Sequence, residues 1–446
     1  MNSFCGLDFG TSNSTFGTTI NKDGEHSPIL IPLEDNKVTL PSAVFFHFDD
    51  NCAYYGREAI NEYIEGEFGR LMRSLKSVLG TPLMNENTQV KTANLPFVDI
   101  VSAYLKNMKM QAEQNSQQTF SHVVMGRPVH FVDNDLEADL LAQDTLEQAA
   151  IRAGFDEVLF QYEPIAAALE YEQQVDDEEI ALIVDIGGGT ADFSVVRISP
   201  ERAQHAERKD DILANGGVHI GGTDFDRKLS LASVMPELGY NSYFKDKNAT
   251  ANFEKSFSIR KSVSSDTYTE STKMMMPSYY YHDLATWHKI HTLYERPITH
   301  SLKDIAYRVE NKQLIDRLIH LIHHREGHRL AIDIEQAKID LTNAATAHLD
   351  LDYVEDDLTL EISETQLHDA VKTEISSIQA HAWRTVQDAG LVPTQITKVF
   401  MTGGTTAIPI VKQAIEAIFP HTDIVQGDQF GSVGLGLAID ASRKFG

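Results

Sequence analysis

Residues 185–192 combine carboxylate, glycine and hydroxyl groups in an order that suits phosphate and magnesium chemistry. The segment reads Asp-Ile-Gly-Gly-Gly-Thr-Ala-Asp. Glycines lack a Cβ atom, so their backbone N–H groups can face a bound anion at close range. Asp185 and Asp192 flank the turn, where a bound Mg²⁺ could use their carboxylates directly or through its own waters. The alternative interpretation is a glycine-rich hairpin in an ordinary sheet.

The apolar runs on both sides of this turn predict two buried strands. They are rich in Val and Ile, and the glycines between them indicate a tight reversal of the chain. The turn is not a Walker phosphate loop, because no Gly-Lys-Ser/Thr follows it and we expect no helix after the glycines.

A second segment of the same design lies at the N-terminus. Residues 4–20 again read as a strand, an Asp-x-Gly-Thr turn and a strand, and Asp8 stands to Gly10 as Asp185 stands to Gly187. Two such segments about 180 residues apart predict a duplicated fold whose halves face one phosphate chain. The repeat favours the phosphate interpretation over the ordinary hairpin.

The composition limits which partners are plausible. The 446 residues include 38 basic and 65 acidic side chains, for a net charge of −27, and 42% are hydrophobic. Such a chain should form about two or three soluble domains. Binding of nucleic acid or of an anionic membrane needs a basic surface, so we expect neither partner. A polyanionic ligand would need local help from a metal, a lysine and backbone amides.

The two cysteines and the N-terminus indicate a cytoplasmic protein. Cys5 falls inside a predicted strand and should be a buried free thiol, and Cys5 and Cys52 lack metal-like spacing. Asp8 interrupts the first apolar stretch and no basic segment precedes it, so a signal peptide is not expected. No apolar run reaches the length of about 18 residues that a membrane span needs.

The apolar periodicity predicts the elements that position these turns. Lys76 lies off the apolar stripe of a helix expected over 68–79, so it is either a solvated side chain or a catalytic one. Glu163 and Pro164 should open a helix, where Pro fits the first turn and Glu lies at the positive end of the dipole. A capping box at 363–366 should begin a long helix that continues through Val386. Further helices are expected over 97–113, 135–153, 335–346 and 407–419.

Residues 240–330 differ in character from the rest of the chain. We expect them to be mostly helical, with an aromatic loop near 277–287. The Met and Tyr residues there could form a partner surface or pack inside the segment. His320, His324 and His328 follow helical spacing and could coordinate a transition metal, although Gly327 would break that helix and no carboxylate or thiol is obviously paired with them.

Taken together, the motifs resemble those of the actin-like ATPase superfamily. Within it they look like the DnaK-type (heat-shock-protein-70) nucleotide-binding domain, over nearly the whole chain outside about 236–325. A YegD-like branch of that family is the most similar, and it is also marked by residues 160–164 and 430–433. The motifs that carry the resemblance are Asp8–Thr11, Tyr162–Leu169, Asp185–Asp192, Gly221–Asp226 and the turn at Gly403–Thr406.

The resemblance implies a role for each matched residue. Asp8 and Asp185 would orient Mg²⁺ through its waters, and Lys76 would lie near the γ-phosphate. Glu163 and Asp192 would position the attacking water, and Asp185 counts among the catalytic residues. The implied nucleotide-binding residues are Gly10, Thr11, Ser12, Asn13, Gly187, Gly188, Gly189, Thr190, Gly221 and Gly222 around the phosphates, and Glu335, Lys338, Thr342, Gly403, Gly404 and Thr405 around the nucleoside.

The resemblance also implies the architecture, an α/β fold of two lobes. Each lobe should be a mixed sheet with flanking helices, closing over ATP or ADP with Mg²⁺, and a mainly helical insertion should extend lobe II. Lobe I is expected over 1–175, with 39–104 as its upper subdomain and 428–446 completing it. Lobe II is expected over 180–427, with 228–345 as its upper subdomain.

Three departures from the family pattern stand out. The two arginines that hold adenine in the family correspond to Ile339 and Ala407 here, and losing two cation–π stacks would cost about 0.5–2 kcal/mol each. We therefore expect weaker ATP binding and looser base selectivity. The stretch from Leu229 to Glu335 is longer than in the family. The chain stops at Gly446, where the family's linker and peptide-binding β-sandwich would follow.

The leading hypothesis is a slow, Mg²⁺-dependent ATPase of the chaperone class that handles client or co-chaperone proteins through its lobe II insertion. A second hypothesis is a nucleotide-gated interaction or filament-forming protein, as in bacterial actins. A third, a kinase for a small acceptor, would need a hydroxyl-binding pocket beside Asp192, and the sequence shows no sign of one.

Overall fold

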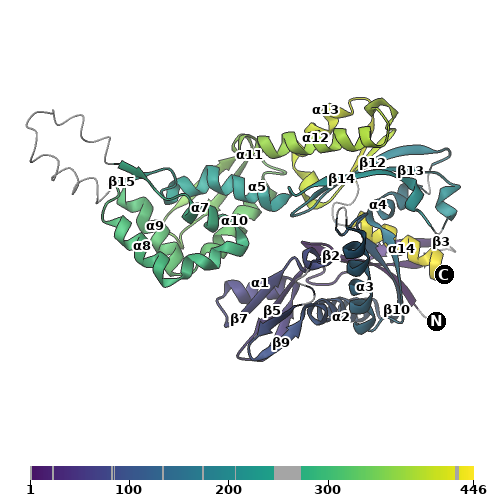
Figure 1. The fold of residues 1–446 in the computed structure, drawn as a ribbon, viewed down its shortest axis with the longest axis horizontal. Helices are drawn as coiled ribbons and strands as arrows, with labels where there is room; N and C mark the ends of the chain where they lie inside the picture. The colour runs from purple at the N-terminus through teal and green to yellow at the C-terminus, as the bar shows by residue number, and fades with distance from the viewer. Residues whose placement is uncertain are drawn as a thin grey trace, which may run out of the picture. The chain divides into compact units, whose positions relative to one another are not determined.

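The protein consists of two compact units. The computed structural model describes residues 3–22, 25–81, 84, 86–132, 135–172, 175–205, 207–245, 273–426 and 431–446. Unit 1 comprises residues 1–222 and 375–446, and unit 2 comprises residues 223–374 (Figure 1). Phe430 and residues 246–272 of the expected insertion lie outside the described residues.

The first sheet of unit 1 carries the N-terminal turn. Its strands run in the order β11-β10-β1-β2-β3. β1 pairs in parallel with β10, which pairs in parallel with β11, whereas β1–β2 and β2–β3 are antiparallel. The bounds are β1 Ser3–Asp8, β2 Asn13–Lys22, β3 Glu25–Leu30, β10 Phe120–Arg127 and β11 Glu157–Tyr162, and β4 (Thr39–Pro41) also pairs with β2.

The second sheet of unit 1 repeats this topology strand for strand. Its order is β14-β13-β12-β19-β20, with β12–β19 and β19–β20 parallel and β12–β13 and β13–β14 antiparallel. β12 therefore corresponds to β1, and Asp185 to Asp8, which confirms the predicted duplication. The bounds are β12 Glu179–Ile186, β13 Ala191–Ile198, β14 Ile212–Val218, β19 Lys398–Thr402 and β20 Asp423–Gln426.

Small residues allow the last helix, α14 (Ser432–Phe445), to lie close against the first sheet and α4 (Glu163–Glu172). A Cβ atom on Gly436 would stand 1.8 Å from the carbonyl oxygen of Ala166, and one on Gly6 would stand 2.4 Å from the backbone nitrogen of Ala438. A larger residue at Gly6 or Gly436 would clash with these backbone atoms. The close packing of α14 therefore depends on glycine, as the small residues of this helix predict.

The other helices of unit 1 lie beside its sheets, and most begin close to where the sequence indicates. The side chain of Asp135 accepts a hydrogen bond from the Ala138 N–H and caps α3, so the expected helix over 135–153 is confirmed. Pro409 opens α13. The bounds are α1 Gly56–Ile64, α2 Phe97–Ser116, α3 Leu136–Arg152, α12 Lys372–Asp388 (which begins in unit 2) and α13 Pro409–Ile418.

The helix expected over 68–79 is wrong. Gly69–Arg73 form strand β7, which pairs with β5 (Ala43–His47), and β5 pairs in turn with β6 (Cys52–Tyr55). Ser74 then takes a left-handed conformation (φ 57°) and turns the chain into a short 3₁₀ helix, η1 (Leu75–Val78). Cross-strand pairing with β5 therefore overrode the local helical spacing. A separate hairpin joins β8 (Asn87–Val90) and β9 (Ala93–Pro96).

Unit 2 is mainly helical among its described residues, as predicted for the insertion. The aromatic loop expected near 277–287 is instead largely helical, since Tyr279–Leu284 form α7, and Tyr280 and Tyr281 are fully buried. The chain therefore uses those aromatic side chains in its core. The helices are α5 Gly222–Leu229, α7, η8 Trp287–Tyr294, α8 Arg296–Ala306, α9 Lys312–His323, α10 Gly327–Asp340 and α11 Glu364–Ala370.

Two strand pairs complete unit 2, and the helix boundaries differ from those expected. β15 (Tyr243–Lys245) pairs with β16 (Lys273–Met275), and β17 (Thr346–Asp350) pairs with β18 (Thr359–Ser363). Ser363 and Gln366 form the predicted capping box. The long helix expected after it is two helices, α11 and α12, because Val371 leaves the helical conformation. α10 begins at Gly327, eight residues earlier than predicted, and ends at Asp340.

No helix within the described ranges has the length and apolar character needed to cross a bilayer. Both cysteines are free thiols; Cys5 is buried, as predicted, and Cys52 is exposed.

Candidate functional site

The glycine turns of the two sheets meet within unit 1. A Cβ atom on Gly188 would stand 2.0 Å from Oγ of Ser12, so the turn after β12 lies against the turn after β1. Gly10 must also be glycine, since its Cβ would stand 2.0 Å from the carbonyl oxygen of Asn13. By contrast, Gly187 and Gly189 face open space, which leaves their backbone approachable by a ligand.

The segments at Gly221–Gly222 and Gly403 are two further turns of the same site. A Cβ atom on Gly221 would stand 2.5 Å from the backbone of Gly188 and Gly189, and the Gly222 N–H donates to the Gly187 carbonyl at 3.0 Å. Gly403 follows β19 with φ 82°, a left-handed conformation that favours glycine.

The hydroxyl of Thr405 links the Gly403 turn to the turn after β12. It donates to the Gly187 carbonyl at 2.8 Å. The phosphate-type turns predicted from sequence are thus held together by backbone contacts, and the carboxyl ends of the parallel strands open onto one region, as in other ligand-binding α/β sheets.

A short ion pair stands beside these turns. Nζ of Lys76 lies 2.6 Å from Oε1 of Glu163, although 87 positions separate the two residues. Lys76 comes from η1, and Glu163 opens α4 immediately after β11. Both side chains are mostly buried, with 12% and 15% of their surfaces exposed. The Glu163 side chain packs closely against Gly126, because a Cβ on Gly126 would stand 3.2 Å from Cγ of Glu163.

The carboxylates of the site repel one another and are poorly solvated. Burial, followed by the charge of Glu163, raises the pKa of Asp8 to about 7. Burial, followed by the charges of Asp192, Glu163 and Asp8, raises the pKa of Asp185 to about 8. Burial works to lower the pKa of Lys76, but Glu163, Asp8 and Asp185 outweigh it and the pKa is raised. The region therefore favours an added cation.

Asp192 lies near the start of β13, directly after the glycine turn that follows β12. In the β12–β13 ladder it is the direct cross-strand partner of Asp185, and its Oδ2 accepts a hydrogen bond from the Thr190 hydroxyl at 2.9 Å. The two carboxylates therefore lie on neighbouring strands at the same end of the sheet, in agreement with their sequence positions on either side of the turn.

Sequence reasoning missed a supporting residue of the first turn. The Ser42 hydroxyl donates to the Gly10 carbonyl at 2.7 Å and lies 3.0 Å from the Ser14 hydroxyl, and its backbone N–H donates to the Ser12 carbonyl at 2.8 Å. The segment between Asn13 and Pro41 gives no local signal for this contact, because it arises only when β4 pairs with β2.

The residues predicted to contact the nucleoside from unit 2 lie on or just after α10. Nζ of Lys338 contacts both carboxylate oxygens of Asp226, at 2.8 and 2.9 Å, and Lys338 is buried. Asp226 belongs to the Gly221–Asp226 motif but received no role from sequence. Thr342 falls in the turn after α10, and Ile339 is 47% exposed. The nucleoside roles of Glu335, Lys338 and Thr342 remain predictions.

Within the part of the chain that the structure describes, no three His, Cys, Asp or Glu side chains are grouped closely enough to hold a metal ion directly. The rings of His320 and His324 stack at 4.0 Å, while α9 ends before His328. Asp8 and Asp185 are compatible with Mg²⁺ held through its waters, since burial and neighbouring carboxylates raise the pKa of both groups and a cation would offset that repulsion.

Two copies of one five-strand topology, joined at acidic glycine turns, define an actin-like ATPase fold. Comparison with known proteins agrees. A family model described as "Hsp70 protein" matches residues 98–248 and 305–443, and the chain therefore belongs to the Hsp70 protein family.

Among curated relatives, the chain is 23% identical over 467 residues to "Chaperone protein HscA" of Pectobacterium carotovorum subsp. carotovorum (strain PC1). It is 24% identical over 438 residues to "Chaperone protein DnaK" of Thermosipho melanesiensis. These alignments cover 99% and 98% of the chain and 58% of each relative, so the chain spans under three fifths of their length.

Proposed function

We propose that the chain binds ATP with Mg²⁺ at the glycine turns of unit 1 and hydrolyses it slowly to ADP and phosphate. The observation that carries this proposal is the convergence of the turns after β1, β12 and β19 beside the Lys76–Glu163 pair, among carboxylates whose pKa values are raised. Membership of the Hsp70 protein family supports it.

Different groups of the chain would bind the phosphates and the magnesium ion during phosphoryl transfer to water. The turns at Gly10–Asn13 and Gly187–Thr190 offer backbone N–H groups to the phosphate oxygens. Mg²⁺, held through its waters by Asp8 and Asp185, would supply positive charge that offsets the carboxylates. Phosphoryl transfer depends mainly on positioning and charge stabilisation, which rigid turns on paired sheets provide.

Lys76 and two carboxylates act at the reacting end of the nucleotide. The Lys76 ammonium remains charged because carboxylates surround it, and it would neutralise charge on the terminal phosphate. Glu163 and Asp192 would accept hydrogen bonds from the attacking water and orient it in line with the leaving group. The ion pair with Glu163 would hold the Lys76 ammonium beside the carboxylates of the site.

We further propose that nucleotide binding is coupled to chaperone work. The relatives that match nearly the whole chain are named chaperones. A nucleotide that contacts the turns of both sheets would favour the arrangement in which they stand close, as Ser12 and Gly188 do here. The client, and any role of unit 2 in holding it, would be identified through nucleotide-dependent protein binding.

The ATPase proposal is tested by turnover with and without Mg²⁺. The wild-type chain should release phosphate from ATP slowly, and EDTA should stop the release. Lys76→Ala and Asp192→Ala should lose at least 100-fold in turnover while keeping their thermal midpoints within a few degrees. Lys106→Ala, which alters an exposed lysine of α2, serves as the matched control. Wild-type turnover in either site variant would contradict the assignment, as would a wild-type chain without activity.

A further inference from the structure

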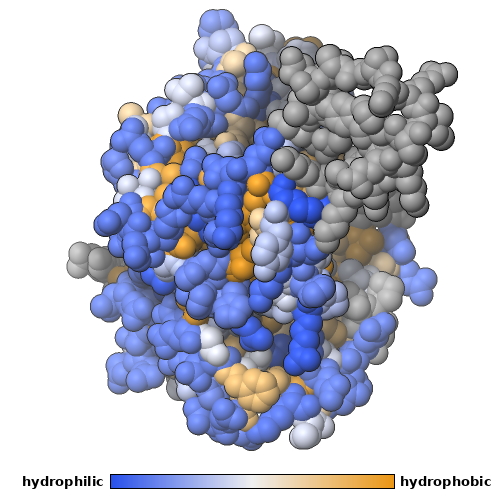
Figure 2. All heavy atoms as spheres, turned by 90° about the vertical axis from the view of Figure 1, so that its left-hand side faces the viewer, coloured by the Kyte–Doolittle hydropathy of each residue, from blue (hydrophilic) through white to orange (hydrophobic). Residues whose placement is uncertain are grey.

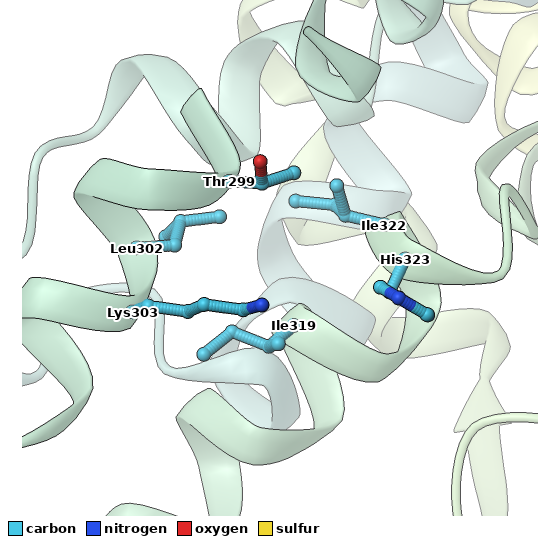
Figure 3. Close-up of a pocket in the computed structure, with 6 residues that line it drawn as sticks. All are labelled: Thr299, Leu302, Lys303, Ile319, Ile322 and His323. Carbon is cyan, nitrogen blue, oxygen red and sulfur yellow. The ribbon is translucent and has the colours of Figure 1, made fainter. Parts of the chain in front are cut away.

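The depression between α8 and α9 on unit 2 is too small for a ligand. Six side chains line it in Figure 3, and it leaves about 10 Å³, which is room for about one water molecule. On the end of unit 2 that faces the viewer in Figure 2, hydrophobic side chains lie between hydrophilic ones, as on an ordinary protein surface. Unit 1, by contrast, contains a buried arginine next to the residues of the proposed nucleotide site.

Arg127 is the last residue of β10, and only 8% of its surface is exposed. Its guanidinium donates to the carbonyl oxygens of Pro128 at 3.1 Å and Val129 at 3.3 Å, so the chain that leaves the strand curls around it. It also donates to Oδ2 of Asp139 at 2.7 Å and to Oε1 of Gln143, which both belong to α3. The planar guanidinium thus fixes the loop after β10 against α3.

Two aromatic rings and a backbone amide surround the ion pair of Arg127 and Asp139. Cζ of Arg127 lies 5.3 Å from the ring centroids of both Phe131 and Tyr162, a cation–π contact with each. Oδ1 of Asp139 accepts a hydrogen bond from the Phe131 N–H at 2.5 Å. The ion pair is therefore held by β10, β11, α3 and the loop between β10 and α3.

The strand end that carries Arg127 also supports Glu163. Arg127 is the direct partner of Tyr162 in the parallel β10–β11 pair, and Glu163 follows Tyr162 as the first residue of α4. Side chains alternate along a strand, so the preceding residue, Gly126, faces the other side of the sheet. There a Cβ on Gly126 would stand 3.5 Å from Oε1 of Glu163, the oxygen that pairs with Lys76. The end of β10 therefore contacts α3 on one face and Glu163 on the other.

The loop and helix held by Arg127 also support the segment that carries Lys76. Gly80 lies two residues after η1 and has φ 73°. Its Cβ would stand 2.6 Å from Cγ2 of Val132, in the loop after β10, and 3.0 Å from the carbonyl oxygen of Ala138, in α3. The chain just after Lys76 therefore rests on the two segments that the guanidinium joins.

We propose that Arg127 is a positioning residue that sets the contact between Lys76 and Glu163. The supports of these two side chains come from distant parts of the sequence, and the Arg127–Asp139 pair joins them. A lysine at position 127 would keep the buried charge, but its ammonium lacks the planar fork that reaches four acceptors at once. The consequence for turnover rests on the proposed ATPase function, whereas the consequence for the Lys76–Glu163 contact does not.

The reactivity of the Lys76 amine towards acetic anhydride reports on this contact in the full chain without nucleotide. Mass spectrometry gives the acetylation rate of Lys76 relative to that of the exposed Lys106. Arg127→Lys should raise this rate at least fivefold, because an ammonium released from its carboxylate loses its proton more readily and is more accessible. Asp139→Asn, which removes only the charge of the partner, should raise it at least twofold. In a Glu163→Gln background, where the ion pair is already lost, Arg127→Lys should change the rate less than twofold.

The matched control is Arg208→Lys, the same substitution in another buried ion pair of unit 1. Arg208 pairs with Glu172 at 2.7 Å, at the opposite end of α4 from Glu163. Its replacement should leave the acetylation of Lys76 within twofold of the wild type. Equal rises in Arg208→Lys and Arg127→Lys would overturn the proposal, because a general loosening of unit 1 would then explain both. An unchanged rate in Arg127→Lys and Asp139→Asn would overturn it as well.

ATP turnover separates this inference from the proposed function. Arg127→Lys should lower kcat at least tenfold and leave KM for ATP within twofold, since Lys76 and Glu163 would act on the reacting phosphate rather than on the nucleoside. Arg208→Lys should keep kcat within twofold. A wild-type chain that does not hydrolyse ATP would refute the proposed function, and the acetylation rates would still decide the role of Arg127. A lower kcat with an unchanged acetylation rate would contradict the positioning role.

Discussion

Replacing Asp185 with Asn should stabilise the ligand-free protein, by an amount that increases with pH. Burial and the charges of Asp192, Glu163 and Asp8 raise the pKa of Asp185 to about 8, whereas an unfolded chain gives Asp a pKa of about 3.9. Between these two values the folded state binds more protons than the unfolded state. The free energy of unfolding therefore falls as pH rises from about 4 to about 8, and Asp185→Asn removes that slope.

The size of the effect follows from the raised pKa. Four pKa units correspond to about 5–6 kcal/mol. This is a ceiling, because Asp8, whose own pKa is raised to about 7, titrates together with Asp185 and shares the repulsion, and because an amide still has to be buried. We expect a gain of about 2 kcal/mol at pH 8.5 and almost none at pH 4.5. For a unit as large as unit 1 that gain raises the thermal midpoint by about 3 °C.

Thermal unfolding followed by circular dichroism in EDTA, from pH 4.5 to pH 8.5, measures the difference between Asp185→Asn and the wild type. Asp144→Asn, which neutralises an exposed carboxylate on α3, is the control and should show no pH-dependent difference. With Mg²⁺ and ADP the order should reverse, since only the wild type keeps both proposed magnesium-orienting carboxylates. A variant that is destabilised equally at every pH would refute the reasoning.

Three further changes test other parts of the fold. Arg208→Met removes a buried guanidinium that donates to Glu172 at 2.7 and 2.9 Å, so urea unfolding should show a loss of about 3–5 kcal/mol, and a loss below 1 kcal/mol would contradict the role of this pair. Gly436→Ala places a Cβ 1.8 Å from the Ala166 carbonyl oxygen and should cost about 1–3 kcal/mol in the same assay; an unchanged midpoint would argue against the close helix crossing. Ser363→Ala removes the capping box of α11 and should cost about 1 kcal/mol, whereas Ser363→Thr should retain most of the stability.

Much of the site could be predicted from sequence, because the backbone geometry of its turns requires glycine at particular positions. The Asp-x-Gly-Thr turn after β1 and its counterpart after β12 both need a tight reversal with approachable N–H groups. Consecutive residues meet this need, so the sequence shows it directly. The duplication of the two sheets follows from the same repeat. The capping box at Ser363 was equally local, and it was confirmed.

Other features depend on pairing between distant segments, and local patterns could not give them. The apolar spacing of residues 68–79 fits a helix, but pairing with β5 makes Gly69–Arg73 a strand and leaves Lys76 on a short 3₁₀ turn. The sequence pattern of Tyr279–Tyr281 predicts a loop. In the structure Tyr280 and Tyr281 pack in the core and the segment is helical.

The sequence by itself determined the family, the duplicated strand-turn-strand plan and the types of residue at the phosphate-type turns. Only the tertiary structure decided how those residues are charged and held. The contact between Lys76 and Glu163, and that between Lys338 and Asp226, join positions 87 and 112 residues apart. The raised pKa of Asp185 likewise depends on burial and on carboxylates from three other segments, because electrostatic energy depends on distance in space and on access to water.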